Sequence, residues 1–380
     1  MSRARDLADL GDGIAVADLP SDVVTTASPS LGRRNLIING AMQVAQRGPS
    51  FTNLANGSYG LDRFSVTKIT GAVVDILQTS DAPTASEAGY LLTHCLHADV
   101  TTADTAVAAS DMYGILQAIE YKNIVQAGFS QSGTRYLTAS FWVKSTKTGT
   151  FCCFIKSADH ARAYVKEYTV SATDTWEHKT LTFPVDTSGG ASWNHNDVGA
   201  TLGWALYGGT NYQITADVWT TTSSNYAPCT VNQVNALDSA SNNFKITGVQ
   251  LEVGSVATPF EHRSYGEELA LCQRYTWVIK SSSAYSLFGP VSVHDASNAN
   301  AIILFPQTIR ATPTLGQSGS FSIYSGDGGD GATVGGIDGN TKSPYGVVLN
   351  LSGSGFTDNS AGFLRGNNDT SASISFFAEL

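Results

Sequence analysis

Apolar and polar residues alternate with a period of two along much of this chain, which is the pattern of β-strands. Residues 136–144 and 178–186 show it most clearly. In the first segment, one parity is apolar and the other mainly polar: Leu137, Ala139, Phe141 and Val143 against Thr138, Ser140 and Lys144. A strand with one buried and one wet face is typical of antiparallel sheets. Many such strands, separated by Gly, Asn and Ser turns, predict a β-sandwich or jelly roll over residues 35–263.

The segment from residue 244 to residue 253 changes the parity of its apolar positions. They are even-numbered before Gly248 and odd-numbered after it: Phe244, Ile246, Val249, Leu251 and Val253. An extra residue inserted into a strand inverts the alternation, and glycine is the residue that most readily permits it. The pattern therefore predicts a β-bulge at Gly248. Farther up the chain, Lys147–Gly149 is expected to form a hairpin turn between two strands.

Residues 266–275 have the clearest helical pattern of the chain. Glu267 and Glu268 lie near its start and Arg274 near its end, which complements the helix dipole. After this helix the strand pattern returns. We expect a buried strand at Ile302–Phe305, a glycine-rich loop region within residues 325–342 and a last strand at Ser373–Ala378.

The chain is therefore expected to be mainly β, with a jelly-roll β-sandwich, a short helical connector and a second, distal β domain. Residues 1–34 are poor in aromatic residues and rich in Ala, Asp, Ser and Pro, so we expect an extended arm that orders against a partner. The predicted divisions are an arm over 1–34, the jelly roll over 35–263, the connector over 264–279 and the distal, receptor-facing domain over 280–380.

Composition narrows the function classes. Charged residues make up 14% of the chain, against roughly 25% in an average soluble domain. The net charge of −10 argues against a protein that binds nucleic acid through its phosphates. No apolar run approaches the ~18 residues of a membrane span. The first residues lack the apolar core of a signal peptide, so we expect synthesis in a cytoplasm without Sec export.

Metal, cofactor and catalytic chemistry find little support in the sequence. The five cysteines are odd in number and irregularly spaced, so they are expected to be free and mostly buried. His94 and His97 lie in a strand-like segment and would point to opposite faces. Neither a nucleophile elbow nor a phosphate-binding loop is present. We expect no enzyme activity, no metal and no cofactor, although chance pairs of carboxylates remain possible among the 32 acidic residues.

Four groups of motifs occur in a fixed order along most of residues 35–315. They are Asn35–Gly48 with Asp62–Phe64, Thr138–Lys144, Thr247–Gly254 with Ala257–Glu261, and Cys272–Tyr275 with Phe305–Pro306 and Arg310–Pro313. Together they resemble bacteriophage tail-fibre and receptor-binding proteins that contain a jelly roll of the carbohydrate-binding-module type. The resemblance implies a homotrimeric fibre or spike on the virion.

The start of the chain is similar to the virion-attaching N-termini of such fibres. By this resemblance the arm binds a phage tail or baseplate protein through Arg3, Arg5, Leu7 and Leu10. The motifs of the resemblance do not identify a receptor site at the level of residues.

Aromatic residues in polar surroundings are the candidates for sugar binding. A sugar ring has an apolar face that stacks on an aromatic ring, and its hydroxyl groups need polar partners. Residues with such surroundings are Trp193, Asn194, Asn196, Tyr212 and Trp219. The alternative, that these rings pack in the core or in a subunit interface, stays open.

Three functions follow from these observations. The first is a virion fibre or spike that attaches the particle to a host-surface polysaccharide. The second is a purely structural fibre or collar component that presents another adhesin. The third is a polysaccharide depolymerase, which ranks last because no catalytic constellation stands out.

Overall fold

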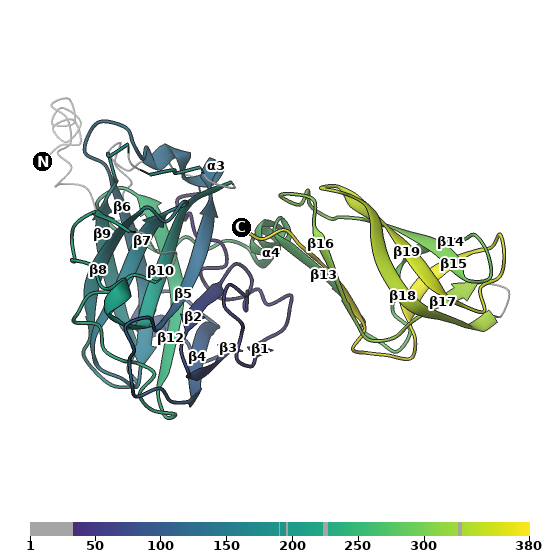
Figure 1. The fold of residues 1–380 in the computed structure, drawn as a ribbon, viewed down its shortest axis with the longest axis horizontal. Coiled ribbons are helices and arrows are strands. Elements are labelled where there is room, and N and C mark those ends of the chain that lie inside the picture. The colour runs from purple at the N-terminus through teal and green to yellow at the C-terminus, as the bar shows by residue number, and fades with distance from the viewer. Residues whose placement is uncertain (1–32, 190, 195–196, 223–226, 326–328) are drawn as a thin grey trace, which may run out of the picture.

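The computed structural model describes residues 33–189, 191–194, 197–222, 227–325 and 329–380. It is mainly β, as predicted. A broad two-layered sandwich and a narrower distal part lie side by side along the long axis of the molecule, with helix α4 (Tyr265–Gln273) between them (Figure 1). The predicted virion-attachment residues Arg3, Arg5, Leu7 and Leu10 lie outside the described residues.

Two six-stranded antiparallel sheets form the sandwich. The first has the order β1 (Ser50–Phe51), β3 (Val73–Thr79), β4 (Cys95–Thr102), β12 (Asn243–Val253), β6 (Tyr136–Ser145) and β9 (Glu177–Pro184). The second has the order β11 (Thr220–Thr221), β8 (Arg162–Val170), β7 (Gly149–Ser157), β10 (Val198–Gly208), β5 (Met112–Glu120) and β2 (Ser65–Ile69). Short helices lie in the connections: α2 (Ala85–Ala88), α3 (Tyr121–Ile124), η3 (Val125–Ala127) and η4 (Thr210–Tyr212).

The sandwich core fills the space between the two sheets. Phe141 of β6 and Trp204 of β10 meet edge to face at 5.4 Å, and both are fully buried. Tyr168 of β8 adds a second edge contact to Phe141 at 5.3 Å. Aromatic and β-branched residues suit these pleated, half-buried surfaces. The five cysteines are free and buried, as expected.

The bulge in β12 is confirmed. Its register against β6 shifts between Thr247 and Gln250, and Gly248 adopts a left-handed φ of 59°. Because of this shift, Ile246 and Val249 both face the core although their parities differ. The bulge therefore allows the apolar side chains on both sides of Gly248 in β12 to face the core.

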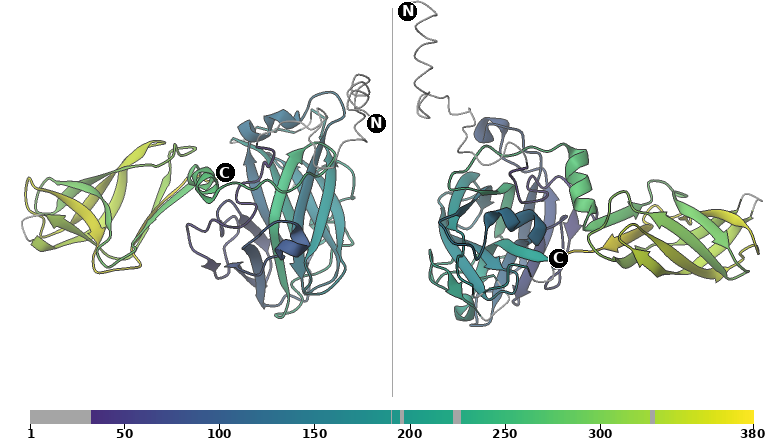
Figure 2. Two further views of the ribbon diagram at one scale, coloured as in Figure 1. Left: turned by 180° about the vertical axis from the view of Figure 1, so that it is seen from behind. Right: turned by 90° about the horizontal axis from the view of Figure 1, so that it is seen from above.

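The distal part contains two sheets. A three-stranded sheet has the order β13 (Thr276–Lys280), β21 (Ser373–Phe377) and β16 (Thr314–Ser318). A closed barrel follows, with the order β14 (Leu287–Val293), β15 (Asn298–Leu304), β19 (Gly346–Ser354), β18 (Gly329–Ser343), β17 (Phe321–Ser325) and β20 (Ala361–Gly366). The two further views show the three-stranded sheet between α4 and the barrel (Figure 2). Helix α4 and the last strand β21 confirm the predicted helix and terminal strand.

Helix α4 begins where the sequence places its capping signals. The Ser264 hydroxyl accepts a hydrogen bond from the Glu267 amide at 3.3 Å, and Glu267 and Glu268 occupy the first turn. A serine at this position and acidic residues beside it satisfy and stabilise the free amides of a helix start. No helix in the described ranges combines the length and the apolar character needed to cross a membrane.

Three local predictions are wrong. Lys147–Gly149 does not close a hairpin: β6 and β7 belong to different sheets, and the turn carries the chain across the core. The glycine-rich run is not a loop after residue 328, because β18 occupies Gly329–Ser343. The strand at Ile302–Phe305 exists as the end of β15, but Ile302 and Leu304 point outward and are exposed.

Polar and charged residues join the sandwich to the distal part. Glu379, which follows β21, pairs with Arg47 at 2.6 Å and with Arg63. The Arg63 guanidinium, only 1% exposed, also lies 3.6 Å from the centre of the Tyr275 ring at the start of the distal part. At the edge of this ring, the Tyr275 hydroxyl donates to Glu120 of β5 at 2.8 Å. The junction is thus a buried, hydrogen-bonded network.

Candidate functional site

A cavity of about 400 Å³ lies at the end of the sandwich that carries α3. One wall comes from α3, η3 and the turn after them, and the other from residues 191–194 between β9 and β10. These two segments are far apart in the sequence but meet because both connect the same ends of the two sheets. The cavity therefore lies among connecting loops on a rigid scaffold, where binding residues are common.

Two stacked aromatic rings form the centre of this cavity. The rings of Trp193 and Phe129 lie 3.7 Å apart between their centres, with an angle of 10° between their planes. Trp219 contacts the indole of Trp193 edge-on at 5.6 Å. The Trp219 Nε1–H donates to the carbonyl of Pro184 at 2.8 Å, which fixes the ring behind the stack. The aromatic centre is consequently held from the core side.

Hydrogen bonds hold the two loops in position. The amide of Ser192 donates to Asp159 Oδ2 at 2.6 Å. On the opposite wall the amide of Ser130 donates to the carbonyl of Asp186 at 2.8 Å. Gly128, with a left-handed φ of 72°, ends η3 and turns the chain just before Phe129. A non-glycine residue would be strained there, so the glycine helps to place the ring.

The carboxylate of Asp159 is suited to its anchoring role. Burial acts to raise its pKa, but hydrogen bonds from Ser157, Ser192 and Ala161 outweigh this and lower the pKa. The group therefore stays ionised and accepts three hydrogen bonds. The loop that carries Trp193 is thereby held by a charge-assisted hydrogen bond.

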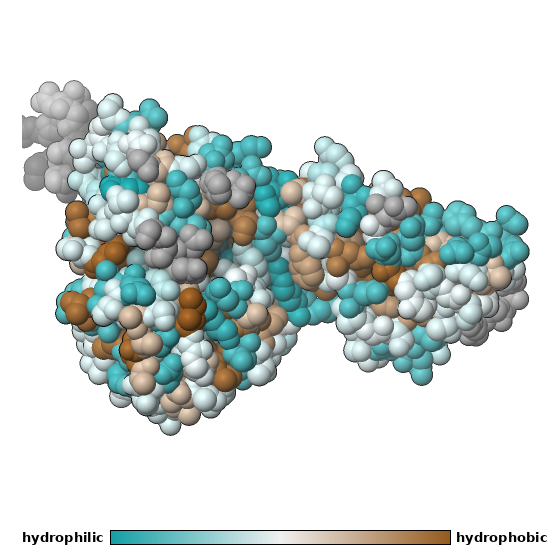
Figure 3. Space-filling model, in the orientation of Figure 1, coloured by the Kyte–Doolittle hydropathy of each residue, from teal (hydrophilic) through white to brown (hydrophobic). Residues whose placement is uncertain are grey.

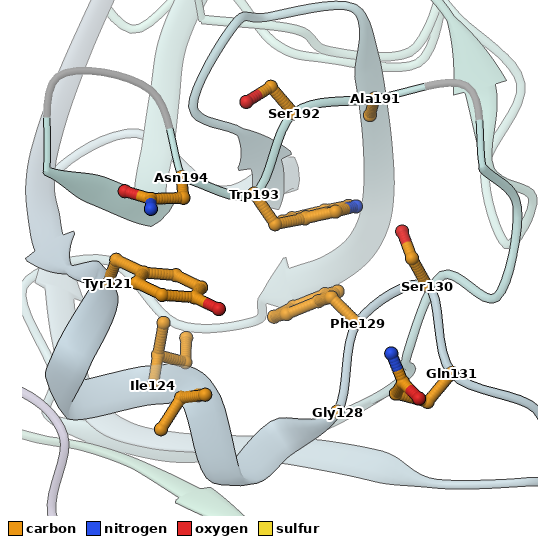
Figure 4. A pocket seen from close by; sticks show the side chains of 11 residues that line it. Tyr121, Ile124, Gly128, Phe129, Ser130, Gln131, Ala191, Ser192, Trp193 and Asn194 are labelled. Atoms are coloured by element: carbon orange, nitrogen blue, oxygen red, sulfur yellow. The ribbon is translucent and has the colours of Figure 1, made fainter.

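The cavity also contains a polar group that the described residues leave without a partner. Trp193 Nε1 is buried and has no hydrogen-bond partner in the part of the chain that the structure describes. Figure 4 shows this nitrogen on the side of Ser130, with Tyr121 and Asn194 at the other side of the stack. A buried N–H without a partner costs free energy, on the order of 1–3 kcal/mol. A ligand that supplies an acceptor would recover that energy.

None of the eleven described residues that line the cavity carries a charge. An apolar ring surface with amide and hydroxyl groups at its edge can hold a neutral, hydroxyl-rich ring. Proton transfer would need a titratable side chain within hydrogen-bond reach of the ligand. The described lining thus suits binding of such a ring, and Tyr121 is its one titratable side chain.

The structure brings together three of the five sugar-binding candidates. Trp193 and Asn194 line the cavity, and Trp219 supports it from behind. Tyr212 lies in η4, buried and outside the lining. Asn196 lies outside the described residues. Trp193 is only 7% exposed and belongs to the sandwich core, so the packing role left open by the sequence applies to most of its ring.

Sequence reasoning missed Phe129 and Tyr121. Phe129 stands between Gly128 and Ser130, an aromatic residue in a turn rather than in an alternating strand. The same signal singled out Trp193 and was available here. Tyr121 gave no such signal, because it directly follows the last residue of β5.

A second cavity of about 670 Å³ lies on the outer face of the second sheet. Lys156 of β7 and Thr201 of β10 pair across this face, and Asp159 and His160 lie at its edge. Burial lowers the pKa of Lys156 to about 7. No group of three or more His, Cys, Asp or Glu residues suited to a metal ion occurs within the described ranges.

No protein-family model matches the chain, and no curated protein matches it. Several solved structures align with a little more than half of the chain. One is the enzymatically active domain of tailspike protein 4 from bacteriophage CBA120, with 13% identity and a TM-score of 0.29 over 53% of this chain. The aligned part spans only 21% of that domain, so the chain matches about a fifth of its length.

Two other similar structures are a carbohydrate-binding module and a putative sugar-binding protein. The family 11 carbohydrate-binding module of Clostridium thermocellum, in complex with a mixed-linked tetrasaccharide, has 13% identity and a TM-score of 0.27 over 55% of this chain and 98% of its own. A putative sugar-binding protein from Bacteroides thetaiotaomicron has 10% identity and a TM-score of 0.31 over 58% of this chain and 99% of its own. TM-scores of this size do not establish a shared function.

Proposed function

We propose that this protein binds a carbohydrate through the cavity of Trp193 and Phe129, as the adhesive component of a phage tail fibre or spike. The observation that carries the sugar-binding part is the buried Trp193 N–H, which has no partner among the described residues, beside a stacked aromatic pair. An aromatic face and a free donor match the apolar face and the hydroxyl oxygens of a sugar ring. The uncharged lining favours a neutral sugar.

The sequence motifs support the remaining parts of the proposal. They resemble phage tail fibres from Asn35 to Pro313, and the arm resembles virion-attaching segments. In this proposal the arm binds a tail or baseplate protein, the chain assembles as a homotrimer on the virion, and the ligand is a host-surface polysaccharide. A single shallow sugar site is weak, and several copies on one particle raise the overall affinity without new contacts.

The test of the pocket is a Trp193→Phe substitution. Alanine would leave a large cavity in the core and confuse binding with stability, whereas phenylalanine keeps a six-membered ring against Phe129 and removes the N–H with a smaller part of the indole. Glycan arrays with the intact oligomer identify the ligand, and calorimetry then measures its affinity. We expect Trp193→Phe to weaken binding about tenfold, the equivalent of one lost hydrogen bond of about 1.4 kcal/mol.

The matched control is Trp176→Phe. Trp176 also donates its indole N–H, to Asp81 at 3.3 Å, but it does not line the cavity. The control is expected to bind the glycan with the affinity of the unmodified chain. Equal affinity of both variants would remove the pocket from the proposal. An array on which the intact oligomer binds no glycan would favour the second function, a structural fibre component.

A further inference from the structure

The outer surface of the barrel carries a continuous row of apolar side chains. Strand register places Pro290 of β14 opposite Phe363 of β20, and Phe363 opposite Tyr324 of β17. Ile302 of β15 follows the pair of Ala301 with Val291 and therefore lies beside Pro290. All four residues are exposed, with Ile302 at 56% and Phe363 at 46%. The row thus crosses four neighbouring strands on the side away from the barrel core.

Leu304, 75% exposed, and Leu287 extend this surface along the strands. We call the six residues Leu287, Pro290, Ile302, Leu304, Tyr324 and Phe363 the barrel face. Facing residues on adjacent strands have Cβ atoms about 5 Å apart, so such a row is one patch and not a set of isolated residues. Figure 3, which shows one side of the molecule, has hydrophobic side chains on the distal part as well as on the sandwich.

The size of the barrel face fits a protein interface. Its exposed side chains amount to roughly 500 Å² of apolar surface, at the upper end of what a monomer exposes in one patch. A standard interface takes about 800 Å² from each partner, of which somewhat more than half is apolar. The barrel face with a polar rim supplies that amount.

The net charge of the chain bears on the kind of partner that the barrel face can bind. Each copy carries a net charge of −10, so two copies repel one another over most of their surfaces. None of the six residues of the barrel face is charged, and the charged side chain that contacts them is a cation: Arg365, paired with Leu287, lies 4.9 Å from the centre of the Tyr324 ring. Contact through this face buries apolar area without bringing carboxylates of two copies together. An oppositely charged partner would instead be recognised through acidic residues, which the face lacks.

We propose that copies of this chain assemble through the barrel face. The face packs against the barrel of a second copy, and the sandwiches, which carry the pockets, stay outside this contact. The assembly does not depend on sugar binding and would hold if the pocket bound nothing.

The experiment compares the mass of the full chain in sedimentation equilibrium with that of an Ile302→Lys, Phe363→Lys double variant. Both positions point outward, so the lysines do not enter the core. The unmodified chain is expected at a multiple of 40.0 kDa, and the double variant at the mass of one chain, with a dissociation constant raised at least 100-fold. The matched control is a Val231→Lys, Val256→Lys double variant, because both valines are exposed and lie outside the distal part.

Three results would overturn the proposal, and the first two concern the mass. One is a single-chain mass for the unmodified protein, and the other is an oligomer that both double variants leave intact. A fall in glycan affinity with the barrel-face variant while the mass stays at one chain would also overturn it, because the face would then be a receptor surface.

A second measurement guards against a variant that does not fold. Leu304→Cys places one accessible thiol on the barrel face, and the five native cysteines are buried. Cross-linking between copies at this position is expected with the substituted chain and not with Val231→Cys. Equal cross-linking at both positions would contradict a specific interface.

Discussion

The sandwich and the barrel expose apolar residues in different ways. On the sandwich, exposed valines such as Val107, Val218, Val231 and Val256 come from separate connecting segments. On the barrel, they fall on facing positions of neighbouring strands and form one surface. Single exposed apolar residues are normal, whereas a contiguous patch indicates an interaction site. Under the proposed assembly, the sandwich is complete in one chain, whereas the barrel is complete only with a second copy.

The junction between the sandwich and the distal part differs from the barrel core in the kind of side chain that it buries. The sandwich side of the junction contributes Arg47 and Arg63, and the distal side contributes the single carboxylate of Glu379. The barrel core, in contrast, is an apolar cluster. The link between the regions is therefore electrostatic at its centre, while each region is held together by apolar packing.

The largest expected effect comes from breaking this link with Glu379→Gln. The substitution leaves two buried guanidinium groups without their shared carboxylate, and breaking a buried pair costs about 3–5 kcal/mol. Denaturant unfolding should show this loss and separate one transition into two, because the sandwich keeps its own core. The control is Glu267→Gln, whose exposed pair with Arg33 at 3.2 Å should cost at most about 1 kcal/mol.

The same variant has a pH signature. Burial acts to raise the pKa of Glu379, but Arg63 and Arg47 outweigh it and hold the pKa below the ordinary value of 4.5. A carboxylate with a lowered folded pKa stabilises the protein above its unfolded pKa, and this stability is lost as the pH falls through the folded value. The unmodified chain should lose stability below about pH 4.5 more steeply than Glu379→Gln. Parallel curves would mean that the pair does not join the regions.

A smaller effect is expected from two neighbouring residues of β15. Ile303 faces the barrel core and Ile302 faces outward. Ile303→Ala should lower the free energy of unfolding by about 2–4 kcal/mol, because it removes packed methyl groups and leaves a cavity. Ile302→Ala should change the stability of the single chain by less than about 0.5 kcal/mol. Dilute samples in which only single chains occur are needed for this measurement.

For association between copies, Ile302 is expected to matter although it contributes little to the stability of the single chain. Its alanine variant should weaken association in sedimentation, since the exposed side chain belongs to the barrel face. If Ile302→Ala destabilised the dilute single chain as much as Ile303→Ala, the outer surface would be covered within one chain. The contrast between the sandwich and the barrel would then disappear.

Much of the fold could be predicted from the sequence because strand alternation and helix capping are local signals. The parity change at Gly248 and the helix at 265–273 are examples. The assignment of strands to sheets is not local: the turn at Lys147–Gly149 resembles a hairpin, yet the next strand crosses the core. After such a turn, the next strand can pair in the same sheet or join the second sheet. The choice depends on packing between distant segments, which a short stretch of sequence does not reveal.

The candidate site was predictable only in part for the same reason. Trp193 stood out by its polar neighbours, but its stacking partner Phe129 lies more than sixty residues earlier and on another connection. The pair of Arg63 and Glu379 spans 316 residues. Contacts between residues so far apart in the sequence depend on the complete topology. A single sequence therefore suggests which residues take part but not which residues pair.

The smallest expected effect concerns glycines, which both regions use within strands. Gly248 in β12 has a left-handed φ, and an added Cβ would lie 3.1 Å from side-chain carbons of Leu92 and Trp142. Gly248→Ala should therefore cost about 1–2 kcal/mol. Gly335 in β18 has no left-handed φ, and an added Cβ would meet only the carbonyl of Ser352 at 3.8 Å. Gly335→Ala should instead stabilise the chain by about 0.5 kcal/mol, because alanine restricts the unfolded state.

Thermal unfolding of the two alanine variants, measured in parallel, tests this difference. Gly248 of the sandwich adopts a backbone conformation that disfavours other residues, whereas Gly335 of the barrel is exposed and adopts one that alanine also tolerates. That distinction explains why a count of glycines predicted a loop where β18 forms a strand. Loss of stability in Gly335→Ala equal to that in Gly248→Ala would show that the run has a backbone requirement of its own, and that the barrel is as tightly specified within one chain as the sandwich.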